Sequence, residues 1–462
     1  MMSERVSRVR TLETTRWYRL TACIVAMMAI ANLQYAWTLF VAPLTEHLNV
    51  QLSSVQVAFM CFVVAQTFLL PATAYMVDRI GTRIVVSGAA ILVGLSWILC
   101  GMADSLPFLY FASIVGGTGA GAVYGACIGL AMKWFPDRRG LCVGLVAGAY
   151  GFGTALTALP ISQMISSSGY KVAFITFGAI QGAVVLAAGQ FLRTPPEGWV
   201  PAGWERMRAN LQSKVQQSAR NYNARQMLRT KSFYGLYSMM TIVAFSGMMV
   251  TAQLQPIAHT FQFDTYILFG GVTVFGVTMV LDGILNGITR PLTGWVSDHI
   301  GRYDTMAISF ALEAIAIMGV TLIGSSPMWF ISLMGLTFFA WGEIYSLFPS
   351  TIADLFGSKY ATTNFSIQYT AKGVASVLAG PVAAWITEAN GGSWIPVLWV
   401  AIAGNLIAAF LALFWLKGAA ARQLGAEESG ALVSASEELP ESQSSEAVEG
   451  SDSLTGAAGR WS

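Results

Sequence analysis

The chain has 462 residues, of which 55% are hydrophobic and only 11% are charged, and its formal net charge is +2. Because a soluble chain carries about 25% charged residues, this composition excludes an ordinary soluble domain and predicts a polytopic membrane protein. The small net charge gives no reason to expect a nucleic-acid partner. The five cysteines lie in apolar segments without a C-x-x-C pair, so we expect neither a metal site nor a disulfide framework.

Twelve apolar stretches are each long enough to cross a bilayer, which takes about 20 helical residues. In chain order, the first six are predicted at 18–44, 53–77, 84–103, 107–133, 141–165 and 170–193. The second six are predicted at 233–257, 267–297, 304–324, 327–352, 361–387 and 393–417. The predicted fold class is therefore an all-α membrane protein with twelve transmembrane helices in two six-helix bundles.

Polar segments divide the chain into five predicted parts. These are an N-terminal segment at 1–17, a six-helix bundle at 18–193, a central loop at 194–232, a second bundle at 233–417 and a tail at 418–462. From Ala202 onward, the central loop has the composition of an amphipathic helix that lies on a membrane surface. The tail is rich in Ser, Glu, Gly and Ala, which predicts a disordered acidic segment.

The distribution of positive charge predicts the orientation in the membrane. With a cytoplasmic N-terminus, every Lys and Arg except Arg290, Lys372 and Lys171 falls in a cytoplasmic loop or terminus, as the positive-inside rule requires. The first apolar run is too long for a signal peptide and has no small-residue cleavage site. We therefore predict a retained first helix, with the central loop and both termini in the cytoplasm.

The two halves of the chain repeat each other at an offset of about 220 residues. The matching pairs are Asp78 with Asp298, Tyr124 with Tyr345, Phe135 with Phe356, and Pro160 with Pro381. This repeat predicts pseudo-symmetric bundles around a central site, which is a common architecture for alternating access. We also expect the two prolines to bend the paired fifth and eleventh helices.

Arg290 and Lys372 are the two cations that lie inside long apolar stretches. A cation at the centre of a bilayer costs about 2.5–3.5 kcal/mol on insertion scales, so both residues are expected to have a function. At 1.5 Å per residue, Arg290 lies roughly 12 Å from the cytoplasmic end of its span and Lys372 roughly 16 Å. Arg can bind a carboxylate bidentately and Lys can neutralise a negative charge as a movable point charge, so the pair is predicted to hold an anion.

A structural ion pair that fixes helix packing is the alternative for both cations, with Asp282, Glu313 and Glu343 as candidate partners. Glu343 leaves three options open. It could face the site in ionised form and lower the charge of the site, or stay neutral through desolvation and carry a proton. It could also face a neighbouring helix and have a structural role.

Two loops resemble the signature of the major facilitator superfamily: Asp78-Arg79-Ile80-Gly81-Thr82-Arg83, and Gly294 to Arg302 with the sequence GWVSDHIGR. Ala74 stands where that pattern has Gly, and His299 stands where it has Arg; neither departure affects the expected fold. The resemblance implies a gate in which charged loop residues pair with neighbouring helix ends. Those residues are Asp78, Arg79, Arg83, Asp298 and Arg302.

Further motifs resemble the oxalate/formate antiporter family. In chain order they are Gln34–Leu39 (QYAWTL), Val123–Gly125 (VYG), Trp134–Gly140 (WFPDRRG), Arg290-Pro291, Phe348–Ser350 (FPS) and Tyr369–Gly373 (YTAKG). The resemblance runs from about residue 17 to 417. It implies antiport of a dicarboxylate such as oxalate for a monocarboxylate such as formate, in the inner (plasma) membrane of a bacterium.

The same resemblance implies which residues bind the substrate. Arg290 and Lys372 match the anion-binding pair of the family. The positions that match the pocket lining are Gln34, Tyr35, Gln56, Tyr124, Trp341 and Tyr345, and Tyr369 adds a ring one turn before Lys372. For the aromatic residues, ordinary core packing is the alternative.

Other functions are compatible with parts of the sequence. One is proton-coupled uptake of a monocarboxylate with Glu343, or Asp282, as the proton-binding group, and a more distant one is a membrane sensor with a carrier fold. We find no nucleophile–base set, metal cluster or phosphate-binding loop, so we expect no enzymatic activity and no cofactor. We expect the protein to be a monomer.

Overall fold

The computed structural model describes residues 2–135, 139–196, 201, 218, 220–357 and 360–425. The first half begins with α1 (Met2–Ile30), α2 (Asn32–Tyr35) and α3 (Thr38–Leu48), which together form the first predicted span. The second span is α4 (Leu52–Phe68) with α5 (Leu70–Ile80). The remaining four are α6 (Thr82–Gly101), α7 (Leu106–Trp134), α8 (Arg139–Ser168) and α9 (Tyr170–Gly189).

The second half begins after the short helix α11 (Ala224–Met227). Its elements are α12 (Lys231–Ala252), α13 (Leu254–Thr260), β1 (Ile267–Phe269), β2 (Val272–Thr273), α14 (Val274–Ile300), α15 (Arg302–Ile323), α16 (Pro327–Trp341) and α17 (Ile344–Phe356). They are followed by α18 (Ala361–Val377), the π-helical turn η2 (Leu378–Val382), α19 (Ala383–Ala389), α20 (Ile395–Phe410) and the π-helical turn η3 (Leu411–Leu416).

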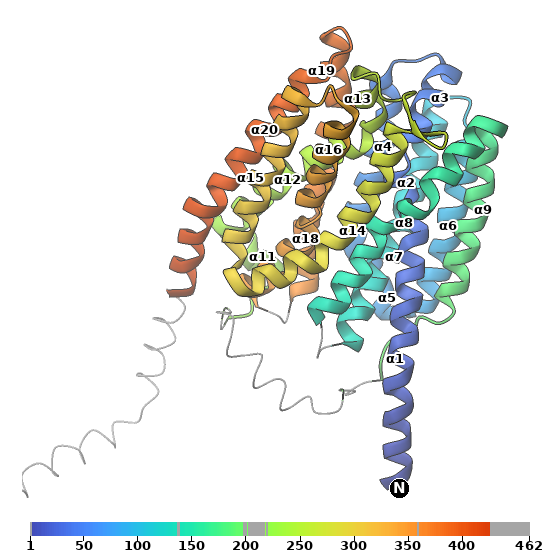
Figure 1. Ribbon diagram of the computed structural model, residues 1–462. Coiled ribbons are helices and arrows are strands. Elements are labelled where there is room, and N and C mark those ends of the chain that lie inside the picture. The colour runs from blue at the N-terminus through green and yellow to red at the C-terminus, as the bar shows by residue number, and fades with distance from the viewer. Residues whose placement is uncertain are drawn as a thin grey trace, which may run out of the picture.

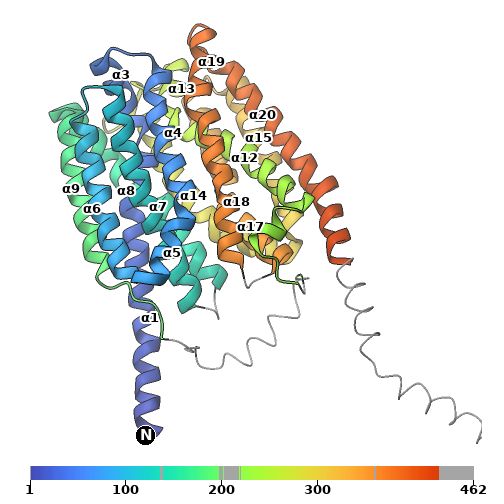
Figure 2. The same cartoon turned by 180° about the vertical axis from the view of Figure 1, so that it is seen from behind.

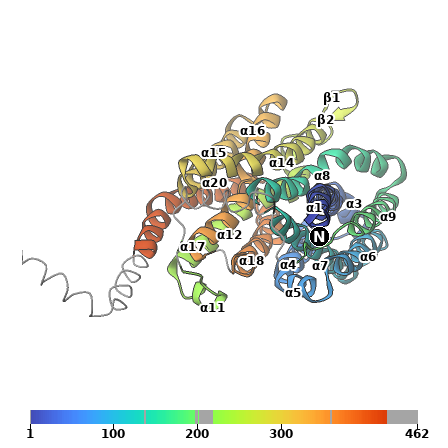
Figure 3. The same cartoon turned by 90° about the horizontal axis from the view of Figure 1, so that it is seen from below.

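The two halves form two helical bundles that stand side by side, as Figures 1 and 3 show. The bundles meet where α8 packs along α14 and where α4 packs along α18. Gly148 and Gly287 allow the first of these contacts, because a Cβ added at Gly148 would lie 2.7 Å from the carbonyl oxygen of Gly287. Small residues of this kind let transmembrane helices approach closely, and they bring the C-terminal half within reach of polar groups on α8.

Among the described residues, eight helices are long and apolar enough to cross a membrane, or ten if each of two bent pairs forms one span. The two predicted spans outside this set are 267–297 and 361–387, which correspond to α14 and to α18 with its continuation. These are the helices that carry Arg290 and Lys372. Their polarity is directed inward, because α14 and α18 bury polar side chains with at most 2% exposure: Asp282, Asn286, Arg290, Asn364, Gln368 and Lys372.

The outer surface of the bundles has the opposite character. Large apolar side chains are exposed on α6, α9, α15 and η3, for example Ile91, Ile180, Ile315 and Phe414. A soluble protein does not expose apolar surface of this extent. Polar groups inside and apolar groups outside are what a lipid environment requires, which confirms the predicted multi-pass membrane fold.

Both described ends of the chain lie at the same end of the molecule. The N-terminal part of α1 projects beyond the bundles, and the helix that follows η3 ends at Gly425 on the same side (Figures 1 and 2). We call this the N-terminal end of the molecule, and the opposite one, where α3 and α19 lie, the outer end. The amphipathic helix predicted from Ala202 and the tail from 426 onward lie outside the described residues.

The structure differs from the sequence prediction at two element boundaries. Residues 267–273 form a short antiparallel hairpin rather than the start of a helix, because Gly270 and Gly271 both have positive φ (55° and 81°) and make the two-residue turn that such hairpins favour. The predicted tail boundary at 418 also comes too early. The chain is helical to Gly425, and its Ala, Arg and Gln residues there have high helix propensity.

Candidate functional site

Arg290 lies on α14 at the contact between the two bundles and is 1% exposed. Its Nη2 donates to Asn286 Oδ1 at 2.7 Å and to Tyr35 Oη at 3.2 Å, and its Nη1 donates to the carbonyl oxygen of Ala147. Tyr35 and Ala147 belong to the first half. The guanidinium is therefore held across the interface between the bundles by neutral acceptors.

Lys372 lies on α18 and has no solvent exposure. Its Nζ donates to Gln34 Oε1 at 2.8 Å, to Gln66 Oε1 at 2.9 Å and to Tyr369 Oη at 3.3 Å. Both amide oxygens belong to the first half. Tyr150 completes this network, because its hydroxyl accepts from Gln66 Nε2 at 2.8 Å and donates to Gln34 Oε1 at 3.0 Å.

The two cations share one aromatic wall. Arg290 Cζ lies 4.2 Å and Lys372 Nζ 5.5 Å from the ring centroid of Tyr345. Within the described residues, no carboxylate lies within ion-pair distance of either cation. The structural ion pair considered as an alternative is therefore not formed in this conformation.

Aromatic rings enclose the two cations on several sides. Tyr124 stacks on Tyr369 with centroids 5.5 Å apart, Tyr35 meets Tyr150 at 5.6 Å, and Trp341 meets Tyr345 at 5.7 Å. All six side chains are at most 3% exposed. Such rings exclude water and present their negative faces to a cation. We call these six rings, with the two cations, Gln34 and Gln66, the central site.

Several buried donors of the central site have no partner among the described residues. They are Arg290 Nε, Gln34 Nε2, Trp341 Nε1 and Tyr345 Oη. Buried polar groups are normally hydrogen-bonded, and three of these four groups can only donate. An arrangement of two cations and unpartnered donors suits a ligand that offers several acceptor oxygens.

The structure gathers eight of the predicted site residues and separates one from them. Those gathered are Gln34, Tyr35, Tyr124, Arg290, Trp341, Tyr345, Tyr369 and Lys372. Gln56 lies elsewhere, since it accepts from Trp37 Nε1 at 3.2 Å and donates to Gln253 Oε1 at 2.8 Å. It joins the bundles nearer the outer end, about 15 Å along α4 from Gln66.

Gln66 and Tyr150 belong to the central site and were missed by sequence reasoning. A signal was present for Tyr150, which stands in a glycine-rich stretch of the fifth span between Gly148 and Gly151. Small residues mark a close helix contact, and a tyrosine beside them lies close to the interface between the two bundles. For Gln66, the sequence offered two glutamines in one apolar span and no means to choose between them.

Glu343 and Asp282 contact neither cation by an ion pair within the described part of the chain. Asp282 is 2% exposed, and its Oδ1 has no partner there. Glu343 has no solvent exposure and lies at the break between α16 and α17. Neither of its carboxylate oxygens has a hydrogen-bond partner among the described residues.

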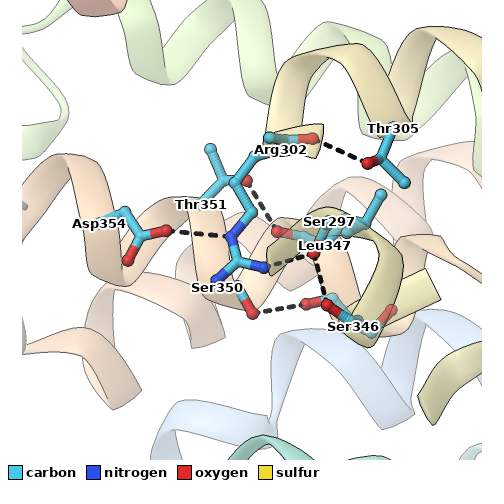
Figure 4. A network of polar contacts seen from close by, with 10 residues as sticks. Ser297, Arg302, Thr305, Ser346, Leu347, Ser350, Thr351 and Asp354 are labelled. Atoms are coloured by element: carbon cyan, nitrogen blue, oxygen red, sulfur yellow. Dashed lines mark hydrogen bonds and ion pairs between the residues drawn. The ribbon is translucent and has the colours of Figure 1, made fainter. Parts of the chain in front are cut away.

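The predicted gating residues lie at the N-terminal end of the molecule. Arg302 Nε donates to Asp354 Oδ2 at 3.1 Å and its Nη1 donates to Ser297, which ties together the ends of α14, α15 and α17 (Figure 4). Arg83 donates to Gln190 at 2.8 Å, and Arg79 lies over the ring of Tyr75. The side chains of Asp78 and Asp298 lie outside the described residues.

A different set of contacts joins the bundles at the outer end. The carboxylate of Glu388, just before the end of α19, accepts from the backbone N–H and from the hydroxyl of Ser53, both at 2.8 Å. Ser53 lies in the first turn of α4, where backbone N–H groups have no helical partner. One half therefore caps a helix of the other at the outer end.

A loop carboxylate at the outer end has a perturbed pKa. Asp104 Oδ1 lies 3.0 Å from His47 Nε2 and 3.0 Å from Lys171 Nζ. The hydrogen bonds from His47 and Lys171 hold the pKa of this carboxyl below its usual value. Lys171 is the one cation that the sequence placed outside, and it is bound to a residue of the neighbouring loop.

Within the described residues, no group of three or more His, Cys, Asp or Glu side chains is arranged to hold a metal ion. The five cysteines are unpaired, and four of them are buried. The central site therefore offers cations, amides and hydroxyls as its means of recognition, all of which suit an oxygen-rich anion.

Comparison with known proteins gives a consistent result. A model of the Major Facilitator Superfamily matches residues 22–363 and 269–440. The oxalate:formate antiporter of Oxalobacter formigenes is 34% identical over 403 residues, which cover 86% of this chain and 91% of that protein. The MFS-type transporter YhjX of Escherichia coli is 24% identical over 79% of this chain and 87% of its own, and monocarboxylate transporter 12-B of Danio rerio is 18% identical over 70% of each.

Proposed function

The chain belongs to the major facilitator superfamily and, within it, to the oxalate/formate antiporter family, and on this premise we propose that it exchanges oxalate for formate by alternating access. It is a multi-pass membrane transporter with small anions as substrates. The relative in Oxalobacter formigenes, which carries the name of this exchange, supports the choice of substrates.

The charge of the central site is the observation that carries this proposal. Arg290 and Lys372 are buried together, with neutral acceptors as their partners in the described part of the chain. Two like charges in a desolvated site are costly, and an anion between them removes that cost. A dicarboxylate supplies one negative charge for each cation, with Arg290 binding one carboxylate bidentately and Lys372 neutralising the other.

The dimensions of the central site favour a short dicarboxylate. The distances of the two cations from the Tyr345 centroid limit their separation to about 9.7 Å. Two charge-assisted contacts of about 2.8 Å each take up more than half of that length. At most about 4 Å then remains between the outermost oxygen atoms of the anion, which suits oxalate and is too short for a four-carbon dicarboxylate in its extended form.

The position of the acceptors supports exchange by alternating access. Both cations belong to the second half, and the amides, hydroxyls and carbonyl that hold them belong largely to the first. An anion that takes the place of these acceptors breaks hydrogen bonds between the two halves. Closure of the halves around the bound anion then forms new contacts between them. A site between two halves that rock against each other is the usual arrangement in such carriers.

Uptake of labelled oxalate into proteoliposomes loaded with an unlabelled anion tests this proposal. Vesicles preloaded with unlabelled oxalate should take up labelled oxalate, and vesicles preloaded with formate should do the same. Arg290→Gln and Lys372→Gln should each reduce both rates at least a hundredfold, because each leaves one carboxylate unpaired in a desolvated site. If labelled oxalate does not enter oxalate-loaded vesicles, oxalate is not the substrate.

The orientation is part of the proposal. We place both termini and the loop that joins the bundles in the cytoplasm of a bacterium, at the inner membrane, because positive charge is concentrated on that side. We also place the Arg302–Asp354 contact at the cytoplasmic gate and the Glu388–Ser53 contact at the outer gate. Labelling of single cysteines at the two ends with a membrane-impermeant reagent in intact cells tests the orientation.

A further inference from the structure

A segment at the N-terminal end of the second bundle carries four exposed cations. They are Arg220, Arg225, Arg229 and Lys231, and we call them the basic strip. Within the described residues, none of the four forms an ion pair, and the sequence contains no acidic residue between positions 218 and 232. The strip is therefore a positive surface without a carboxylate to balance it.

Tyr222 fixes the start of the basic strip on the ends of two helices. Its backbone N–H donates to the carbonyl oxygen of Phe356, at the end of α17, at 2.9 Å. Its own carbonyl oxygen accepts from Asn364 Nδ2 of α18 at 2.9 Å. Its ring lies edge to face with that of Phe356, with centroids 5.6 Å apart, and supports Arg220, whose Cζ lies 5.1 Å from the Tyr222 centroid. The first cation of the strip is thereby held in place by the bundle itself.

Two helix caps fix the rest of the strip. Asn223 and Gln226 form a reciprocal capping box at the start of α11, with both contacts at 3.0 Å. Met227 ends α11 without any solvent exposure. Thr230 then caps α12, because its Oγ1 accepts from the backbone N–H of Phe233 at 3.3 Å. Caps of this kind define the backbone, so the cations lie at fixed backbone positions, which lowers the entropy cost of binding a partner.

Helix α12 places the end of the strip at the level of the lipid headgroups. From Lys231 to Ala252 this helix has 22 residues, which span about 33 Å at 1.5 Å per residue and match a hydrocarbon core about 30 Å thick. Lys231, its first residue, therefore lies at one boundary of that core. Tyr234 follows one turn later on the same face and is 57% exposed. Tyrosine is enriched at the boundary between a membrane and water, which fits this depth.

The strip lies on the periphery of the molecule and combines charge with apolar surface. Figure 3 shows α11 at the edge of the second bundle rather than between the bundles. Leu228 is exposed between Arg225 and Arg229 in the chain, and Tyr234 is exposed below Lys231. Cations that accompany exposed apolar side chains are typical of a surface that lies against a membrane.

We propose that the basic strip binds the phosphate group of an anionic phospholipid. The guanidinium groups can each bind two oxygens of a phosphate, Lys231 adds a further charge, and the acyl chains lie along α12 beside Tyr234. Clusters of four or more Lys and Arg next to a transmembrane helix are typical of such sites. The inference requires only the membrane fold and does not depend on which substrate the protein carries.

A competing partner for the strip is the chain beyond Gly425, which carries eight acidic residues. The helix that leads to it is held beside the strip, because Gln423 Oε1 accepts from the hydroxyl of Ser232 at 2.9 Å. Charge alone suits either partner. The depth of the strip in the membrane and the exposed Leu228 and Tyr234 favour the lipid, because they place the cations against headgroups and acyl chains.

Labelling of the full chain in proteoliposomes tests the inference. The vesicles contain phosphatidylcholine and a small fraction of phosphatidylglycerol whose headgroup carries a diazirine, and mass spectrometry after irradiation measures the label on residues 220–234. Phosphatidylcholine with the same diazirine should label this segment at least about tenfold less. Arg225→Gln with Arg229→Gln should lower the label from phosphatidylglycerol about 25-fold, since each cation beside an anionic membrane contributes about fivefold. Arg225→Lys with Arg229→Lys keeps both charges and should retain most of the label.

Two results would overturn the inference. One is equal labelling of the wild-type strip by the anionic and the zwitterionic lipid, which needs no variant. The other is weak labelling of the wild type that becomes strong when the eight acidic residues beyond Gly425 are replaced by their amides, because the strip would then bind that segment instead. Lys171→Gln, at the opposite end of the molecule, should leave the label on the strip unchanged.

Discussion

Replacing Lys372 by glutamine removes one of the two buried charges and leaves the other in place. Like charges about 9.7 Å apart, the largest separation that the Tyr345 distances allow, repel by at least about 1.7 kcal/mol at an effective dielectric constant of about 20. At the same dielectric constant, a carboxylate about 4 Å from an ammonium is attracted by about 4 kcal/mol. Lys372 therefore stabilises the bound dianion and destabilises the central site when no anion is bound.

The substitution should affect the two anions unequally. Oxalate needs a cation for each carboxylate, so its binding should weaken by about 3–4 kcal/mol, which is roughly a hundred- to several-hundredfold. Formate has one carboxylate, which Arg290 can bind alone, and its affinity should fall by about tenfold or less. The preference for oxalate over formate should therefore fall by at least about tenfold.

Thermal unfolding of the purified protein in detergent, titrated with each anion, measures both affinities. Lys171→Gln is the matched control, because it removes an exposed lysine that is bound to Asp104 at 3.0 Å in a loop at the outer end. It should leave both affinities unchanged. An equal loss for oxalate and formate would refute the assignment of one carboxylate to each cation, and an unchanged affinity for oxalate would remove Lys372 from the binding site altogether.

Three further predictions concern other contacts. Gln66→Glu places a carboxylate against Lys372, so the ligand-free protein should unfold at a higher temperature and bind oxalate about a hundredfold more weakly; unchanged binding would contradict this. Glu388→Gln weakens the cap at the start of α4 by about 1–3 kcal/mol. A cysteine introduced at Gln56 should then react faster with an impermeant maleimide. An unchanged rate would show that the cap does not hold the outer gate. The pKa of Asp104 is lowered in the folded protein, so its contribution to stability is complete at neutral pH and is lost as the pH falls through that lowered value. The difference in unfolding temperature between wild type and Asp104→Asn should therefore be constant from about pH 6 to 8 and shrink below about pH 4; a difference that grows on acidification would contradict the sign.

The two cations were recognisable in the sequence because the free-energy cost of placing a charge in the bilayer does not depend on the details of the tertiary structure. A charge in the middle of an apolar stretch is expensive wherever its helix is placed. Helical rise alone put Arg290 and Lys372 at similar depths. The repeat and the loop motifs then predicted two bundles, and the family match confirms that prediction.

The choice between Gln56 and Gln66 required the tertiary structure. Both belong to one apolar helix, α4, and each is almost completely buried. The packing of α4 along α18 determines which of them reaches Lys372, and that packing depends on contacts from both halves at once. Tyr150 also required the tertiary structure, because its hydroxyl joins Gln34 of α2 to Gln66 of α4.

The direction of Glu343 is a second feature that the sequence left open. Its neighbours Trp341 and Tyr345 both face the central site, and a helix break between them could have turned the acid either way. In the structure it forms no ion pair with Arg290 or Lys372 within the described residues. The central site therefore keeps both of its positive charges in this conformation.

By itself, the sequence determined the class of protein, the number of spans and the two charges that an anion requires, because each follows from the cost of placing a given residue in a bilayer. Only the tertiary structure decided which neutral groups hold those charges, and that no buried acid of the described residues forms an ion pair with them. Those properties depend on how helices from distant parts of the chain are rotated and packed against each other.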